Sequence, residues 1–544
     1  MKLTGFLFAA ALLGSCTQPA AEENYTRHVD PKIGTGGHGH VFVGANVPFG
    51  LVQVGPTSIP QTWDWCSGYH ASDSTVIGFS HTHLSGTGIG DLFDVTVMPV
   101  TGDVTYARGE EADPASGLWS YADRTQEIAR PGYYSVPLTR YGIRAELTAT
   151  ARVGLHRYTF PASDAAAVVF DLENGGCWDK ATETHLAKEG DRTVTGWRHS
   201  TGWAKDQRVY FAAEFSKPFE KFETIGDNYA RASFRTTDGE QVSLKVALSP
   251  VSIEGAKANL AAELPGWDFD ATAAAADKAW NDELSKVKIE TADETARRIF
   301  YTALYHTMIA PSLFCDVNGD YRGADGKVHE NLGRDTYTTF SLWDTYRAAM
   351  PLMTVLHPER MPDIIQTMLH IADEQGRLPV WHLWGNETDC MVGNPGIVAV
   401  ADAIVKGIGG FDREKAFEAI RKTAMNPDRG NGLRMEYGYI PCEMFNEAVA
   451  YDMEYALADG AAARAAETLG KAEDAKYFEE RSHSYRNYFD PATRFMRGRD
   501  SRKGWRTPFN AFASTHRADD YCEGNAWQYT WLACLLYTSD AADE

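Results

Sequence analysis

The first half of the chain alternates apolar and polar side chains over short runs, from about residue 28 to residue 265. "DVTVMPVTGDVTYA" and "SLKVALSP" are typical of these runs, and residues that favour turns separate them at roughly strand-length intervals. A period of two turns every second side chain of a strand toward the same face. Residues 28–265 are therefore predicted to form an antiparallel β-sandwich.

The hydrophobic spacing becomes helical from about residue 266 to residue 533. "DFDATAAAADKAWNDELSKV" is rich in alanine, opens with an aspartate that can cap a helix, and repeats apolar residues at helical spacing. Further helical stretches follow, separated by loops dense in Gly, Asn, Trp and Asp. This order predicts an α-solenoid or a closed ring of helical hairpins. The chain shows no fixed-period repeat, which argues against a simple solenoid.

The first 16 residues, "MKLTGFLFAAALLGSC", predict export. Lys2 precedes an apolar segment from Leu3 to Leu13, which is too short to span a bilayer and is typical of a signal peptide. The segment ends in Leu-Gly-Ser-Cys, a match to the bacterial lipobox, so Cys16 is predicted to become the lipidated first residue and residues 17–27 a tether. The alternative is an ordinary signal peptide cleaved nearby. Either way the protein is expected to leave the cytosol. With Cys16 lipidated, we expect a periplasmic or outer-membrane protein that meets the membrane only through this anchor.

Composition excludes several classes of partner and site. The formal net charge is −22 and no run of Lys and Arg is present, so binding to nucleic acid or to an anionic membrane is not expected. The eight cysteines form neither a CxxC motif nor a zinc-like Cys/His spacing. Disulfides suit an exported protein, but spacings this wide do not specify a pairing. The chain has 25 Tyr, 25 Phe and 14 Trp, which suits sugar stacking but is explained more simply by a core.

Six loops combine residues that rarely occur together by chance. In the first half they join glycines with Trp and His, and in the second half they join Trp with carboxylate or amide side chains. The six are "IGTGGHGHVFVGANVPFG" (33–50), "WDWCSGYH" (63–70), "GFSHTHLSGTGIGD" (78–91), "SLWDTYR" (341–347), "PVWHLWGNETDCMVGN" (379–394) and "EGNAWQY" (523–529). A flat apolar platform with planar polar groups is what a monosaccharide pocket requires. Each loop alone could be a turn or a helix cap, but all six together favour a sugar site.

The remaining chemistry is that of carboxylates. No nucleophile elbow, P-loop or dinucleotide fingerprint occurs in a strand–turn–helix context. The leading acid–base candidates are Glu523, Glu387, Asp344 and Asp389. A glutamate beside Trp527 in a partly apolar cleft would have its charged form disfavoured and could hold a proton near neutrality. Glu523 is therefore the first candidate for a general acid.

Two stretches resemble metal sites but lack complete ligand sets. His81-x-His83 could supply two ligands, yet no third follows at a recognised spacing. "DVNGDYRGADG" (316–326) is rich in oxygen ligands, but it lacks the terminal Glu of a calcium-binding EF-hand loop. We expect the histidines to hydrogen-bond to substrate or to loop backbone, and 316–326 to form a turn.

Five strings, in order, carry a resemblance to a known family. They are "VDPKIGTGGHGHVFVGANVPFG", "WDWCSGYHASDSTVIGFSHTHLSGTGIGD", "SLWDTYRAAMPL", "GNETDC" and "EGNAWQYTW". From about Val29 to about Leu532 the chain resembles the calcium-dependent exo-α-mannosidases of glycoside hydrolase family 92. The resemblance implies a β-sandwich followed by an (α/α)6 barrel, with the pocket between them. It also implies removal of terminal α-mannose from mannose-containing glycans, with inversion, by a general acid and a general base.

The resemblance also implies roles for individual residues. Glu523 would be the general acid, and Asp344 and Trp65 would hold the terminal mannose. Asn386 and Glu387 would lie in or beside the pocket. The implied cofactor is Ca²⁺, a hard cation that prefers oxygen and can bind O2 and O3 of mannose together.

The chain departs from the family pattern in three places. Asn394-Pro395 stands where relatives continue with Tyr-His, and "GYIPCEMFNEAVAYDMEYALAD" keeps only part of the usual pattern. The third departure is the ending: a Gly-Asn-Glu-Pro-Ser-His-His stretch and a Gly-Asn-Asp-Asp-Cys-Gly-Gln stretch are missing, and "CLLYTSDAADE" (534–544) resembles a translated sequencing adapter. We therefore expect that this chain is truncated and that its general base and most calcium ligands lie beyond residue 544. In this form it is expected to be inactive.

Other interpretations stay open at this point. The chain could be another (α/α)-barrel glycosidase acting on a glucoside, or a non-catalytic glycan-binding lipoprotein. A helical scaffold protein would leave the six loops unexplained. The linkage that is cleaved does not follow from the sequence.

Overall fold

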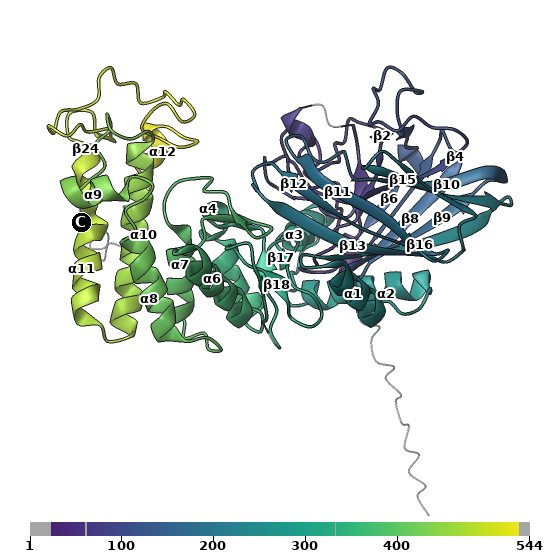
Figure 1. Cartoon of the computed structure of the whole chain (residues 1–544). Coiled ribbons are helices and arrows are strands. Elements are labelled where there is room, and N and C mark those ends of the chain that lie inside the picture. Colours follow the sequence, from purple (N-terminus) through teal and green to yellow (C-terminus); the bar gives the residue numbers. More distant parts are fainter. Residues whose placement is uncertain (1–22, 60–61, 332, 533–544) are drawn as a thin grey trace, which may run out of the picture.

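The computed structural model describes residues 23–59, 62–331 and 333–532. Within them an antiparallel β-rich domain lies at one end and a helical domain at the other (Figure 1). The predicted fold class, an antiparallel β-sandwich followed by a helical domain, is thus confirmed. The predicted signal peptide with Cys16, most of the tether and the 534–544 tail lie outside the described residues.

The β-sandwich consists of two antiparallel sheets. One has the order β1 (Gly55–Thr57), β3 (Gly78–Ser80), β4 (Thr96–Thr101), β10 (Ser163–Asp171), β15 (Tyr229–Thr236) and β14 (Lys221–Ile225). The other has the order β11 (Lys180–Glu189), β12 (Thr193–Thr201), β13 (Gln207–Phe215), β16 (Glu240–Ser249), β9 (Val153–Phe160), β8 (Ile143–Ala149), β7 (Tyr133–Leu138) and β6 (Ile128–Arg130). The sheets meet across a core in which Phe170 of β10 stacks on Phe211 of β13, with ring centroids 6.0 Å apart. The alternation in the sequence predicted these strands and their two facing sheets, although central strands such as β4 and most of β10 are buried on both faces.

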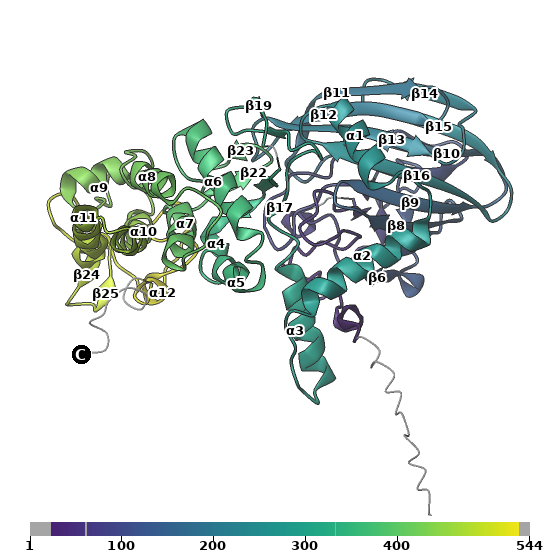
Figure 2. The same cartoon turned by 90° about the horizontal axis from the view of Figure 1, so that it is seen from below.

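Helices α1 (Ile253–Glu263) and α2 (Phe269–Leu284) pack against the outer face of the eight-stranded sheet (Figure 2). The capping aspartate of α2 is Asp268, whose side chain accepts from the N–H of Ala271. Trp280 of α2 is fully buried and donates from its indole to the carbonyl of Asn46, at 2.7 Å. These contacts fasten the start of the helical half to the sandwich.

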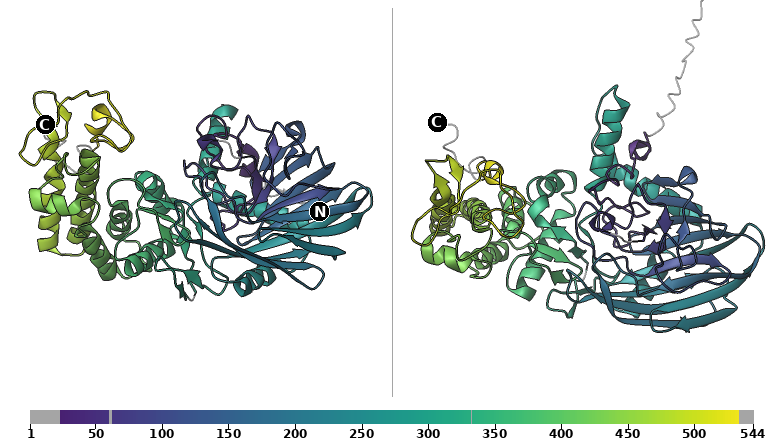
Figure 3. Two further views of the ribbon diagram at one scale, coloured as in Figure 1. Left: turned by 45° about the horizontal axis from the view of Figure 1, so that its top comes forward. Right: turned by 90° about the horizontal axis from the view of Figure 1, so that it is seen from above.

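Beyond α2 the chain is mainly helical (Figure 3): α3 lies beside α2 and η1, and the later helices form a separate body. In order the helices beyond α2 are α3 (Glu294–His306), α4 (Leu342–Thr345), α5 (Ala349–Leu356), α6 (Met361–Gln375), α7 (Pro395–Val405), α8 (Arg413–Ala424), α9 (Asn431–Tyr437), α10 (Ala448–Thr468), α11 (Ala472–Ser482) and α12 (Ala526–Tyr529). Helix α10 packs against α7, α8 and α11 and is buried along most of its length. In the described part of the chain, no helix is both long and apolar enough to cross a membrane.

Short elements connect these bodies. The strands are β2 (Thr75–Val76), β5 (Ser120–Tyr121), β17 (Ser312–Leu313), β18 (Tyr321–Arg322), β19 (Val328–His329), β20 (Tyr337–Thr338), β21 (Phe340–Ser341), β22 (Trp381–Leu383), β23 (Asn386–Glu387), β24 (Phe489–Asp490) and β25 (Phe495–Met496). The 3-10 helices are η1 (Tyr25–His28), η2 (Trp63–Trp65), η3 (Arg124–Gln126) and η4 (His483–Tyr488). Among these, the small sheet β21-β22-β23 bears on the site, because its last strand contacts the sandwich.

One contact between the domains runs through Asn386 of β23. Its side chain donates to the carbonyl of Asp206 and accepts from the N–H of the same residue, each at 3.0 Å. Asp206 lies between β12 and β13. This asparagine therefore adds a contact between the two domains beside the pocket described next, together with bonds such as that from Arg322 to the carbonyl of Pro250.

Candidate active site

A cavity of about 690 Å³ lies between the two domains. The sandwich loops contribute His40, Trp63, Gly86, Thr87, Gly88, Ile89, Trp178 and Trp203, and the helical domain contributes Ser341, Asp344, Trp381, Cys390, Met391, His516, Arg517 and Glu523. All six loops singled out in the sequence therefore meet here, although some are hundreds of residues apart. A pocket at this junction is also what the family resemblance implies.

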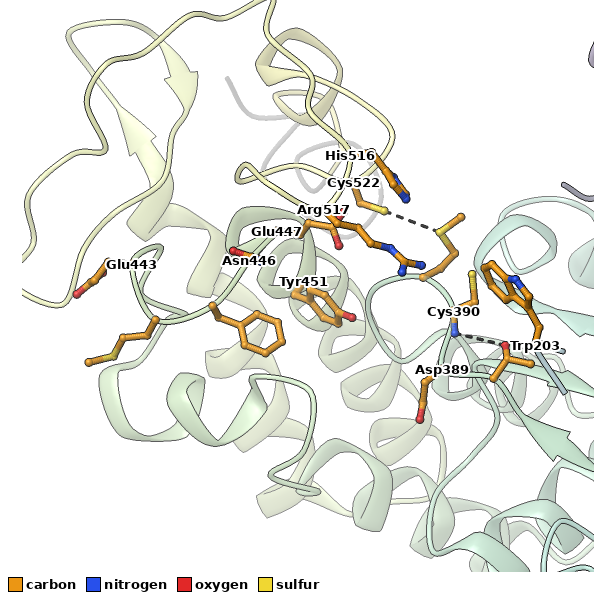
Figure 4. Close-up of a pocket in the computed structure, with 14 residues that line it drawn as sticks. Trp203, Asp389, Cys390, Glu443, Asn446, Glu447, Tyr451, His516, Arg517 and Cys522 are labelled. Carbon is orange, nitrogen blue, oxygen red and sulfur yellow. Dashed lines mark hydrogen bonds between the residues drawn. The ribbon is translucent and has the colours of Figure 1, made fainter. Parts of the chain in front are cut away.

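A second cavity, of about 680 Å³, continues the first. The two share Trp203, Cys390, Met391, His516 and Arg517. From there the second cavity extends along the start of α10 (Figure 4). A molecule larger than one sugar could therefore occupy both.

Tryptophans form the sandwich side of the first cavity. Trp63 and Trp178 are 47% and 39% exposed, which is high for this residue type. Trp178 stacks on Trp203 with ring centroids 6.2 Å apart. A Cβ on Gly88 would lie 2.6 Å from the ring of Trp63, so only glycine permits this ring position. Exposed flat rings of this kind can stack on the apolar face of a sugar.

Asp344 and Glu523 bring two carboxyl groups to the same cavity. Asp344 lies in the first turn of α4, where its side chain accepts from the hydroxyl of Ser341. Glu523 precedes α12, whose capping box joins Asn525 to Gln528 and explains the "EGNAWQ" string. Glu523 has φ of 48°, in the left-handed region that residues with a Cβ seldom adopt. Backbone in this region is often found at functional sites.

The cavity favours the protonated form of Glu523. Partial burial raises the pKa of its carboxyl above the ordinary value, and the negative charge of Asp344 raises it further. A carboxyl group that holds its proton near neutrality can act as a general acid.

Trp65 and Trp63 share η2 but face different partners. Trp65 donates from its indole to Asp73 at 2.8 Å and stacks on His70, with ring centroids 4.6 Å apart. Trp63 donates to the carbonyl of Gly88 at 2.8 Å and lines the cavity. The role predicted for Trp65 stays a prediction, and in this structure Trp63 is the residue of η2 among those that line the cavity.

Glu387 and Asn386 support the cavity from behind. The carboxylate of Glu387 accepts from the N–H groups of Val380, Trp381 and Asp389, at 2.8, 2.9 and 3.0 Å. It therefore holds the turn that presents Trp381 to the cavity, while Asn386 holds the domain contact. Asp389 of the same loop forms an ion pair with Arg377. Sugar contacts by Asn386 and Glu387 stay a prediction.

Glu447 was not singled out from the sequence. It lines the second cavity, is only 7% exposed, and its Oε1 is buried without a hydrogen-bond partner among the described residues. Burial raises its pKa, and its charge in turn raises that of Glu523. The sequence signal was weak, because "FNEAVAY" looks like the ordinary start of a helix.

His81 and His83 are buried inside the sandwich and form hydrogen bonds there. His81 Nδ1 bonds to the carbonyl of Val95 at 2.6 Å and its Nε2 to His156 at 2.9 Å, while His83 Nδ1 bonds to the carbonyl of Gln53 at 2.8 Å. Burial lowers the pKa of His81 to about 3 and that of His83 to about 4, so both rings are neutral. The prediction that they bond to loop backbone is confirmed.

One group of described side chains has the spacing of a metal site: Glu283, His357 and Glu359. Lys286 Nζ lies 2.7 Å from Glu283 Oε2 and 3.0 Å from Glu359 Oε1, and it also contacts His357 at 3.3 Å. The ammonium group therefore already fills the centre of this cluster. Calcium takes six to eight oxygen ligands, so these residues do not fit the ion that the resemblance implies.

Comparisons with known proteins agree with this architecture. The model of the glycosyl hydrolase family 92 N-terminal domain matches residues 28–249, and that of the family's catalytic domain matches residues 255–535. A family GH92 α-mannosidase from Bacteroides thetaiotaomicron, solved in complex with mannoimidazole, superposes with a TM-score of 0.91 at 38% identity, over 94% of this chain and 71% of that one. A family GH92 inverting mannosidase from Bacteroides thetaiotaomicron VPI-5482 superposes with a TM-score of 0.85 at 29% identity, over the same shares.

A curated relative from Arthroderma benhamiae, described as an uncharacterized secreted glycosidase, is 27% identical over 553 residues. The match covers 91% of this chain and 66% of the relative, so the chain spans just under two thirds of that protein's length.

Proposed function

The chain belongs to glycosyl hydrolase family 92, and from this premise we propose that the protein is an exo-acting α-mannosidase. It removes terminal α-linked mannose from glycans, with inversion at the anomeric carbon and with a requirement for calcium. The observation that carries the proposal is the meeting of Asp344 and Glu523 in a cavity walled by Trp63, Trp178 and Trp203. The mannosidase names of the solved relatives point to the same substrate class.

Glu523 is the proton donor in this proposal. It protonates the glycosidic oxygen as the bond to the leaving sugar breaks, which its raised pKa favours. Asp344 binds hydroxyl groups of the terminal mannose, and the tryptophan rings cover its apolar face. The second cavity, beyond Trp203, receives the leaving sugar. The calcium requirement rests on the family resemblance and is not assigned to the Glu283 cluster.

The proposal includes export and lipid anchoring at Cys16. The secreted relative supports export. Replacing Cys16 with serine should move the protein from the membrane fraction to the soluble fraction, while a Ser15→Ala control should leave it in the membrane fraction.

The test uses the protein expressed from the genomic reading frame that contains this sequence. It is incubated with calcium and a panel of α-linked disaccharides of mannose and glucose, and the released sugar is followed by proton NMR. The expected result is mannose in the β-anomeric form, lost on chelation and lost in Glu523→Gln. A matched Glu436→Gln variant, at an exposed position of α9 that lines neither cavity, should keep activity. Release of glucose without mannose, or full activity in Glu523→Gln, contradicts the proposal.

A further inference from the structure

Three loops pack closely together on the sandwich side of the cavity, with glycines of one loop against side chains of the other two. They are residues 62–66, 88–90 and 175–178. A Cβ on Gly90 would lie 2.7 Å from Cβ of Cys177 and 3.0 Å from the ring of Trp178. Gly88 holds the ring of Trp63 in the same way. The glycines therefore bring the loop of Trp63 and the loop of Trp178 into close contact.

Two thiols meet at this contact. Cys66 Sγ lies 2.7 Å from the carbonyl oxygen of Trp63, and Cys177 Sγ lies 3.6 Å from that of Thr62. Both sulfur atoms thus lie over the same turn, next to the carbonyls of consecutive residues, and each thiol shifts the pKa of the other. Cys66 is fully buried, whereas Cys177 is partly exposed.

We propose that Cys66 and Cys177 form a disulfide in the exported protein, and that this bond ties the loop carrying Trp63 to the loop carrying Trp178. The bond is independent of the proposed mannosidase activity and depends only on export to an oxidising compartment. The oxidant is the disulfide of an exported dithiol oxidoreductase.

The exposure of the two thiols sets the order of the reaction. The proximity of the two thiols lowers the pKa of Cys177 and raises that of Cys66. The exposed Cys177 thiolate attacks a sulfur of the oxidant, and the oxidant's second sulfur leaves as a thiolate. Cys66 then loses its proton and attacks Cys177 Sγ, which releases the first sulfur of the oxidant. Two electrons and two protons pass to the oxidant, which becomes a dithiol.

For Cys522 and Cys315 the sulfur contacts that the structure shows are with other residue types. Cys522 Sγ lies 3.8 Å from the thioether of Met391, and Cys315 Sγ lies 3.6 Å from the guanidinium of Arg152. The contact between Cys66 and Cys177 therefore predicts one defined pairing rather than random oxidation.

The bond would act on the cavity through the tryptophans. It closes a loop of more than one hundred residues, so it removes conformational freedom from the unfolded chain. In the folded chain it restrains two loops that otherwise touch through glycines. A sugar platform held in place before binding loses less freedom when the ligand arrives.

The experiment is peptide mapping of the full chain, expressed with its own leader in a bacterium with an oxidising periplasm. The protein is denatured in N-ethylmaleimide without reductant, digested and analysed by mass spectrometry. The expected result is a cross-linked peptide joining Cys66 to Cys177, about 2 Da lighter than the two free peptides together, as loss of two hydrogens requires. Maleimide on both cysteines, or a bond from either one to a different cysteine, overturns the proposal.

Thermal unfolding gives a second measurement. Reductant should lower the Tm of the wild-type chain by about 5–10 °C. It should not change the Tm of Cys66→Ser or Cys177→Ser, and a Cys315→Ser control should respond as the wild type does. An equal effect of reductant on the wild type and on both of the first two variants overturns the proposal. Neither measurement involves mannose release. Both can therefore be interpreted even if the protein does not release mannose.

Discussion

Replacing Arg198 with methionine should destabilise the sandwich strongly and in a pH-dependent way. Arg198 is fully buried on β12, where Nη1 donates to Asp94 at 2.7 Å, Nη2 donates to Asp179, and Nε donates to the carbonyl of Leu172 at 2.9 Å. Methionine has a comparable apolar stem but no charge. The variant therefore leaves two buried carboxylates without their cation.

The magnitude follows from the protons that these carboxylates would take up. An aspartate in the unfolded chain has a pKa of about 3.9, so protonating it at pH 7 costs about 4 kcal/mol. Asp94 keeps bonds from Thr82 and Gln207, and Asp179 keeps one from Ser200. We therefore expect one protonation rather than two, and a loss of about 4 kcal/mol, within the range for breaking a buried pair. For a domain of this size that lowers Tm by about 8–16 °C.

The sign of the pH dependence distinguishes this cause from loss of packing. Burial already raises the pKa of Asp94, although Arg198 opposes that shift. Without Arg198 the folded state binds a proton that the unfolded state lacks, so stability is kept below the unfolded pKa and lost as the pH rises through the folded pKa. At pH 5 the same protonation costs about 1.5 kcal/mol, so the deficit should shrink by more than half.

The assay is thermal unfolding of the full chain at pH 5 and pH 7, followed by far-UV circular dichroism. Arg231→Met is the matched control, because Arg231 bonds to the carbonyls of Gly102 and Ala165 and its deficit should not depend on pH. Adding Asp94→Asn and Asp179→Asn to the Arg198 variant should recover part of the stability. A Tm loss below about 3 °C at pH 7, or an equal loss at both pH values, refutes the reasoning.

The proposed activity leads to further predictions. Glu523→Gln should lower kcat on disaccharides by about 10²–10⁴-fold but spare mannosyl fluoride, whose leaving group needs no proton. Because burial and Asp344 raise the pKa of Glu523, activity should fall as the pH rises through that pKa, and the variant should lack this limb of the pH–rate profile. Glu447→Gln should move the limb to lower pH, since the charge of Glu447 also raises that pKa; an unmoved limb contradicts this. Asn386→Ala should destabilise the contact with Asp206 by about 1–3 kcal/mol and lower the Tm of the chain in calorimetry, whereas an unchanged Tm argues against it. EGTA should abolish mannose release and calcium, but not magnesium, should restore it; activity that survives EGTA contradicts the calcium requirement.

The layers and the gathering of the loops could be predicted from the sequence because they depend on local patterns. Alternation decides which side chains of a strand face the core, and helical spacing decides the same for a helix. Asp344 and Glu523 could be grouped because each stands in a string that serves no obvious packing role. The two strings share one property in the structure: each places its carboxylate residue in the same cavity.

The finer assignments depend on contacts between distant segments, which local patterns do not contain. Trp63 and Trp65 are two residues apart and equally suited to a sugar platform. Their roles are separated by Gly88, which holds one ring at the cavity, and by Asp73, which binds the other. Glu387 has the chemistry of a sugar ligand, but the hairpin of β22 and β23 turns three N–H groups toward it.

The bond pattern of Asn386 has a consequence for how the two domains vary among relatives. At residue 206 the side chain of Asn386 bonds only to main-chain atoms, one N–H and one carbonyl. Every residue except proline has both a main-chain N–H and a carbonyl, so the residue at position 206 can be substituted without loss of these bonds. Position 386 cannot be substituted in this way. Aspartate has no N–H donor, and the side chain of glutamine is too long for the same two bonds. Substitutions should therefore accumulate on the sandwich side of this junction while its partner stays an asparagine.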